Sequence, residues 1–130
     1  MRDAASLPVR PPRRAARSDR RSRLARGSGV RLCVSSAPPR AAGRLARLLL
    51  AHRLAACVSV VPGVRSTYRW KGRVEQGKEV LLVVKTTAAL VPRCVALLVS
   101  EHPYEVPEIL VAAPDRVSAA YAAWVHAETA

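Results

Sequence analysis

The residues of this chain that could take part in chemistry gather around His102. His102 closes a predicted helix and precedes Pro103, and three carboxylates lie near it in the sequence, those of Glu101, Glu105 and Glu108. A neutral imidazole is a good ligand for copper and zinc, and carboxylates add oxygen ligands. A cationic imidazole at a helix end can instead cap the free carbonyl groups. The sequence leaves both interpretations of His102 open.

The three cysteines of the chain are far apart and odd in number. No apolar signal-peptide segment precedes them, so we expect a reducing cytoplasm rather than a secreted disulfide framework. Cys57 lies inside an apolar run and is interpreted as a small buried hydrophobe, with a soft thiolate ligand as the alternative. Cys33 alternates onto the strand face opposite Leu32 and Val34, toward a helix or solvent. Cys94 is expected in the core.

Familiar catalytic and metal-binding motifs are missing from the sequence. There is no paired CxxC, no HExxH, no glycine-rich phosphate loop and no GxSxG elbow. A nucleophile with a base and an orienting group is not identifiable either. We therefore expect neither a structural zinc site nor an enzyme.

Composition and charge predict one domain with a modest core. Half of the 130 residues are hydrophobic but none is Phe, so Val, Leu and Ala must fill the core. The net charge of +13 is uneven, because residues 1–28 carry nine Arg against two Asp. Residues 29–130 are only mildly basic, so we do not expect nucleic acid as a partner. No apolar run approaches the roughly 18 residues of a membrane span.

Residues 1–28 are rich in Arg, Ala, Ser and Pro, and we expect them to form a disordered extension of a domain that covers residues 29–130. Three hypotheses compete for this extension. It is a basic arm for acidic surfaces, an organelle transit peptide, or a segment without function. The transit-peptide hypothesis is weakened by prolines at positions 8, 11 and 12, which interrupt an amphipathic helix.

Hydrophobic periodicity predicts four strands and three helices. The longest strand covers residues 54–70 and is bent at Pro62 and Gly63, because proline cannot donate to a ladder and glycine tolerates a kink. Lys71 and Gly72 end it, and residues 75–78 are predicted to form a polar turn. The other strands are expected at 30–35, 79–86 and 107–113, and the helices at 40–53, from 87 or 90 to 102, and at 118–128.

The order β-α-β-β-α-β with a terminal helix predicts an α+β, ferredoxin-like fold: an antiparallel four-stranded sheet with two helices on one face. The other face of this sheet has no cover in a single chain. A trimer or dimer that packs sheets together would supply one. In the second half of the long strand, Val64, Ser66, Tyr68 and Trp70 alternate with polar residues. This half projects as an arm or is covered by another subunit.

Three stretches together resemble the CutA family of divalent-cation tolerance proteins. They read RLAACVSVVPGVRSTYRWKG at 53–72, EVLLVVKT at 79–86 and EHPYEVPEIL at 101–110, and the resemblance extends over residues 30–128. It implies a non-catalytic homotrimer with long strands pairing between subunits. It also implies a role in metal tolerance through divalent metal binding, copper(II) above all, with zinc as the alternative. The trimer is similar to that of PII signalling proteins, whose clefts bind small effectors.

The resemblance also implies roles for individual residues. His102 matches a histidine implicated in copper binding, and Glu101 replaces a second histidine of some members. A strand cysteine of some members falls at Ser35 here, and Cys33, on the same strand face, is its candidate substitute. Cys57 matches a usual cysteine of the family. The cleft between subunits is implied to be lined by Tyr68, Trp70, Glu79, Lys85, Tyr104 and Glu108.

An alternative hypothesis for the same resemblance is a PII-like sensor. It would bind a small anion or a protein partner at this cleft. Arg65, Arg69 and Lys85 would supply the positive charge, and Tyr68 and Trp70 would form a wall.

Overall fold

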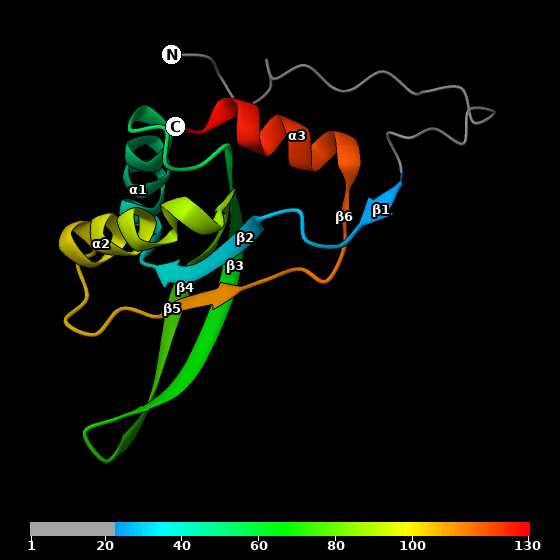
Figure 1. The fold of residues 1–130 in the computed structure, drawn as a ribbon. Coiled ribbons are helices and arrows are strands. Elements are labelled where there is room, and N and C mark those ends of the chain that lie inside the picture. Colours follow the sequence, from blue (N-terminus) through cyan, green and yellow to red (C-terminus); the bar gives the residue numbers. More distant parts are fainter. Residues whose placement is uncertain (1–22) are drawn as a thin grey trace.

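A four-stranded antiparallel sheet with two helices on one face forms the centre of the protein, as the computed structural model of residues 23–130 shows (Figure 1). The predicted ferredoxin-like α+β fold is therefore confirmed, with the strands in the order β3-β4-β2-β5. Residues 1–22 of the predicted extension lie outside the described residues. The elements of this layer are β2 (Val30–Ala37), α1 (Pro39–Ala51), β3 (Cys57–Trp70), β4 (Arg73–Thr87), α2 (Val91–Glu101) and β5 (Ile109–Ala112).

The core lies between this sheet and the helices α1 and α2. Helix α1 begins at Pro39, where the fixed φ of proline suits the first turn. Its buried residues Ala42, Leu45 and Leu49 follow the helical period and face the sheet. Cys94 and Leu98 of α2 are buried in the same cluster, together with alternate residues of β2 and β4: Cys33, Ala37, Val80, Leu82 and Val84.

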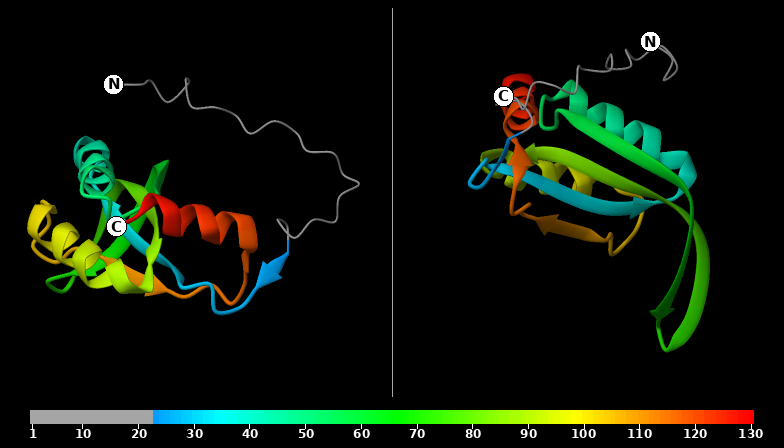
Figure 2. Two further views of the ribbon diagram at one scale, coloured as in Figure 1. Left: turned by 45° about the horizontal axis from the view of Figure 1, so that its top comes forward. Right: turned by 90° about the vertical axis from the view of Figure 1, so that its right-hand side faces the viewer.

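The opposite face of the sheet is apolar and has no helix over it (Figure 2). It carries Leu32 and Val34 of β2, which are half-buried, and Leu110 of β5, which is 58% exposed. Val61 of β3 on this face is 43% exposed. Cover by another subunit therefore stays a prediction, and the exposed apolar side chains are the reason for it.

Strands β3 and β4 extend beyond the helix-covered part as a long hairpin, which we call the arm and which projects at the bottom of Figure 1 and of the right-hand view of Figure 2. The predicted bend is confirmed, since the ladder shifts register between Val61 and Val64. The predicted turn at residues 75–78 is wrong, because this segment is part of strand β4 and pairs with β3. The chain reverses at Lys71 and Gly72, both with positive φ, as in a two-residue hairpin turn.

A short 3₁₀ turn, η2 (Ala88–Leu90), precedes α2. Pro92 then lies in the first turn of α2, where its missing N–H costs no helical hydrogen bond. Of the two predicted starts of this helix, residues 87 and 90, the second is closer to the observed start at Val91.

Helix α3 and a two-stranded sheet of β1 and β6 lie beside one end of the central sheet, and the sequence predicted only the helix. Helix α3 (Ala119–Glu128) packs Val125 against Val30 at one end of the sheet. Strand β1 (Leu24–Ala25) pairs with β6 (Val117–Ser118), so this piece of the predicted disordered extension has a place in the fold. His126 Nε2 also lies 2.7 Å from the carbonyl oxygen of Ser28. No helix within residues 23–130 has the length and apolar character to cross a membrane.

Candidate ligand-binding cavity

A cavity of about 680 Å³ lies between the arm and the segment 103–108 that leads from α2 to β5. Five of the six residues predicted for the cleft line it, namely Tyr68, Trp70, Glu79, Tyr104 and Glu108. The other lining residues are Ser36, Ser66, Thr67, Pro103, Glu105, Val106 and Pro107. The cavity therefore brings together most of the predicted cleft within one chain.

The alternation of the arm explains why these side chains meet. Ser66, Tyr68 and Trp70 follow one another at every second position of β3, so they share one face. Glu79 pairs with Val64 across the ladder and therefore lies on that same face. Gly77 has no side chain, and a Cβ atom there would lie 3.9 Å from the Tyr68 ring. The ring of Tyr68 thus lies beside the space that Gly77 leaves free.

Among the described residues that line the cavity, Glu79 is the only carboxylate that is buried, with 8% of its surface exposed. The hydroxyl of Tyr104 donates a hydrogen bond of 2.9 Å to Glu79 Oε2. Within residues 23–130, the ion pairs join Arg26 and Arg116 to Asp115 and Arg44 to Glu101, and none includes Glu79. A carboxylate removed from water without a cation is unfavourable, so a positive charge entering the cavity would be stabilised there.

Tyr104 is held as a hydrogen-bond donor by its surroundings. Burial, and then the hydrogen bond to Glu79 and its charge, raise the pKa of the Tyr104 phenol to about 12. The phenol therefore stays protonated at neutral pH and keeps donating to Glu79.

His102 ties the segment 103–108 to the sheet. Its Nδ1 accepts a 3.1 Å hydrogen bond from the backbone N–H of Tyr104. The proton must then be on Nε2, which lies 2.7 Å from the carbonyl oxygen of Ser36 and donates to it. Both ring nitrogens of the buried His102 are thus occupied, and the side chain neither caps α2 nor has a nitrogen free for a metal ion.

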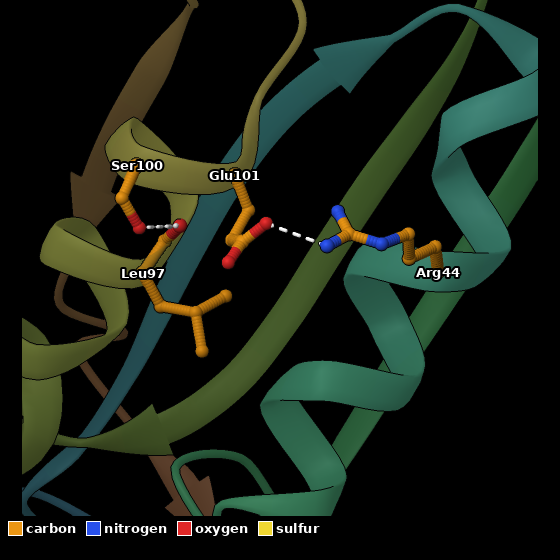
Figure 3. Close-up of polar contacts among 4 residues, drawn as sticks. All are labelled: Arg44, Leu97, Ser100 and Glu101. Carbon is orange, nitrogen blue, oxygen red and sulfur yellow. Dashed lines mark hydrogen bonds and ion pairs between the residues drawn. The ribbon is translucent and has the colours of Figure 1, made fainter.

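The other two predicted metal ligands have partners elsewhere. Glu101 Oε2 accepts a 2.7 Å hydrogen bond from Arg44, which links α2 to α1 (Figure 3). Cys33 is fully buried and packs in the same core cluster as Cys94 of α2. In the part of one chain that the structure describes, no three His, Cys, Asp or Glu residues are placed to hold a metal ion. The predicted set of His102, Glu101 and Cys33 is therefore not brought together.

Lys85, the sixth residue predicted for the cleft between subunits, is not among the residues that line this cavity of one chain. It lies six residues along β4 from Glu79, about 20 Å away at the rise of a strand. There its Nζ donates to Ser59 Oγ and lies 3.7 Å from the sulfur of Cys57. Cys57 is half-buried beside this ammonium group rather than in the helix-facing core.

The positively charged side chains that would bind an anion are therefore missing from the described part of the cavity. Arg65 and Arg69 alternate with Tyr68 onto the other face of the arm. Neither Lys nor Arg is among the described lining residues, which include three Glu. The lining that sequence reasoning missed includes Ser66, and the alternation of β3 already placed Ser66 on the face of Tyr68.

The fold and the cavity define a small ferredoxin-like α+β protein with a ligand-sized, acidic and aromatic site. A family model described as the CutA1 divalent ion tolerance protein matches residues 31–128. The chain therefore belongs to this family.

Individual relatives agree with this assignment. Protein CutA of Mus musculus is 38% identical over 103 residues, which are 79% of this chain and 58% of that protein. The divalent-cation tolerance protein CutA of an Escherichia coli strain is 40% identical over 101 residues, 77% of this chain and 88% of that protein. The chain thus spans about three fifths of the length of the mouse relative.

Solved structures show the same fold. CutA from Synechococcus elongatus superposes with a TM-score of 0.81 at 33% identity, covering 86% of this chain and all of that one. A protein described as the PII-like protein CutA from a Nostoc species, in apo form, has a TM-score of 0.73 at 34% identity, with 77% and 97% covered.

Proposed function

We propose that this chain acts in divalent-metal-ion tolerance as a non-catalytic homotrimer and that its cavity binds the cation. One observation carries the proposal: the lining contains three carboxylates, and the buried one, Glu79, has no cationic partner among the described residues. A divalent cation would neutralise this charge, which is otherwise costly to bury. Membership of a divalent ion tolerance family supports the same conclusion.

Copper(II) is the first metal of this proposal and zinc the second. Carboxylate oxygens suit hard cations best, but for a given set of nitrogen and oxygen ligands the affinity rises to a maximum at Cu²⁺ and falls again at Zn²⁺. Glu79 would be the central ligand, and the exposed Glu105 and Glu108, which also line the cavity, would attract the cation. His102, Glu101 and Cys33 stay outside this proposed site, because His102 and Glu101 are hydrogen-bonded elsewhere and Cys33 is fully buried in the helix-facing core.

The homotrimer is part of the proposal because one described chain does not supply three adjacent ligands. The cavity opens on the same sheet face that exposes Leu110 and Val61, since Glu79 and Leu81 point the same way from β4. A second copy that covers this apolar face would therefore approach the cavity and add ligands to it.

The cytoplasm is the compartment that we propose. Cys33, Cys57 and Cys94 are all free thiols in the structure, which suits a reducing compartment.

A calorimetric titration with copper(II) and zinc(II) tests the proposed function. We expect saturable binding with copper tighter than zinc, and at least about tenfold weaker copper binding by Glu79→Gln, since tenfold corresponds to about 1.4 kcal/mol of lost interaction. Glu128→Gln, which removes the same charge from the exposed end of α3, is the matched control and should bind normally. Copper binding that is unchanged in Glu79→Gln would refute the site.

A PII-like sensor of a small molecule is the second candidate function. The size of the cavity favours it, because a volume of about 680 Å³ lies in the range of pockets that hold small organic molecules. The acidic lining does not suit the anion that this hypothesis first included.

A further inference from the structure

We propose that the cavity binds an organic ammonium ion, with Glu79 as its counter-ion and the rings of Tyr68, Trp70 and Tyr104 as its walls. This inference rests on the proposed function only in using the same cavity. It does not depend on the metal, and it names a different class of ligand.

Size is the first reason. The cavity measures about 680 Å³, whereas one water molecule takes up about 30 Å³ of the liquid. A single metal ion with its ligands would leave most of this space to solvent. An ammonium ion with several carbon substituents would fill far more of it and would displace that solvent.

Charge is the second reason. Only 8% of the surface of Glu79 is exposed, and the neutral phenol of Tyr104 donates a hydrogen bond to it. The other charged lining residues are Glu105 and Glu108, both exposed at the mouth, and no basic residue is found among the described lining. A cation therefore meets attraction at the entrance and a partly desolvated counter-charge at the back.

The aromatic side chains select between kinds of cation. Tyr68, Trp70 and Tyr104 are 47%, 38% and 37% exposed, so part of each ring is open to a ligand. Ring faces attract ammonium groups, and alkyl substituents on the nitrogen also gain apolar contact. Lys71 shows that Trp70 accepts such a contact, since its Nζ lies 5.8 Å from the ring centroid. Val106 and Pro107 add apolar lining for the alkyl groups.

The test uses the full chain in its native assembly and choline as the probe. The matched neutral probe is 3,3-dimethylbutan-1-ol, which has carbon in place of the charged nitrogen. Binding is measured by calorimetry and by Trp70 fluorescence in a Trp124→Phe background, because the chain has two Trp residues. We expect saturable choline binding, with the neutral probe and Glu79→Gln each at least about tenfold weaker. Glu128→Gln should bind choline like the parent protein.

Two results would overturn the inference: choline that does not bind saturably, or a neutral probe that binds equally well. Copper binding without choline binding would overturn this inference and leave the proposed function standing. Choline binding that depends on Glu79, in a protein that binds no copper, would support this inference and overturn the proposed metal site.

Discussion

The hydrogen bond from Tyr104 to Glu79 predicts how much stability the protein loses when the Tyr104 hydroxyl is removed. Tyr104→Phe removes only the hydroxyl and with it the hydrogen bond that this hydroxyl donates to the buried Glu79 carboxylate. A hydrogen bond to a charged group contributes about 1.5–3 kcal/mol, and we take the lower end because water reaches a side chain that is 37% exposed. The free energy of unfolding of the variant should therefore be lower than that of the parent protein by about 1.5 kcal/mol.

Urea denaturation followed by circular dichroism measures this loss, with all proteins at one chain concentration because assembly adds to apparent stability. Glu79→Gln is the second variant of a double-mutant cycle. Its amide oxygen can still accept a hydrogen bond from Tyr104 but carries no charge. In that background Tyr104→Phe should cost only about 0.7 kcal/mol, as for a neutral hydrogen bond. An equal cost in both backgrounds would refute the claim that the charge of Glu79 is what Tyr104 stabilises.

Three further predictions concern His102, the link between the helices, and pH. His102→Ala should lower the unfolding free energy by about 1–3 kcal/mol, because it leaves the buried carbonyl of Ser36 and the N–H of Tyr104 unpaired; unchanged urea denaturation would contradict this. Arg44→Ala should cost at most about 1 kcal/mol in the same assay, since its ion pair with Glu101 is exposed, and a loss of 2 kcal/mol or more would be too large. The folded pKa of about 12 at Tyr104 lies above the ordinary tyrosine value of about 10, so its stabilising contribution is complete below pH ~10 and is lost as the pH rises through ~12. Near-ultraviolet absorbance should show this late phenol ionisation in the parent protein and not in Tyr104→Phe.

Local sequence patterns were sufficient to predict the sheet, the helices and the arm. Alternation in β3 placed Tyr68 and Trp70 on one face, and Pro62 with Gly63 predicted the bend that the ladder shows. The error at residues 75–78 came from treating polar residues as a turn. In the structure these residues pair along the arm, where polar side chains remain exposed on a strand.

The candidate site was less predictable, because the contacts of its residues depend on how elements far apart in the sequence pack together. Glu101 was expected beside a metal, but the antiparallel packing of α1 and α2 brings Arg44 to it. Strand alternation correctly placed Cys33 opposite Leu32, yet only the position of α2 decides that Cys33 is buried in one core cluster with Cys94. Lys85 was assigned to the cleft between subunits by resemblance alone and stays a prediction there; within one chain its distance along β4 separates it from Glu79.

The most direct measurement of the central claim is anomalous X-ray scattering at the copper edge from crystals of the full chain grown with copper(II). We predict a peak in the cavity about 2 Å from a carboxylate oxygen of Glu79, the usual length of such a metal–oxygen bond. The peak should disappear in Glu79→Gln crystals. A peak at His102 or Cys33, with the cavity empty of metal, would contradict the account.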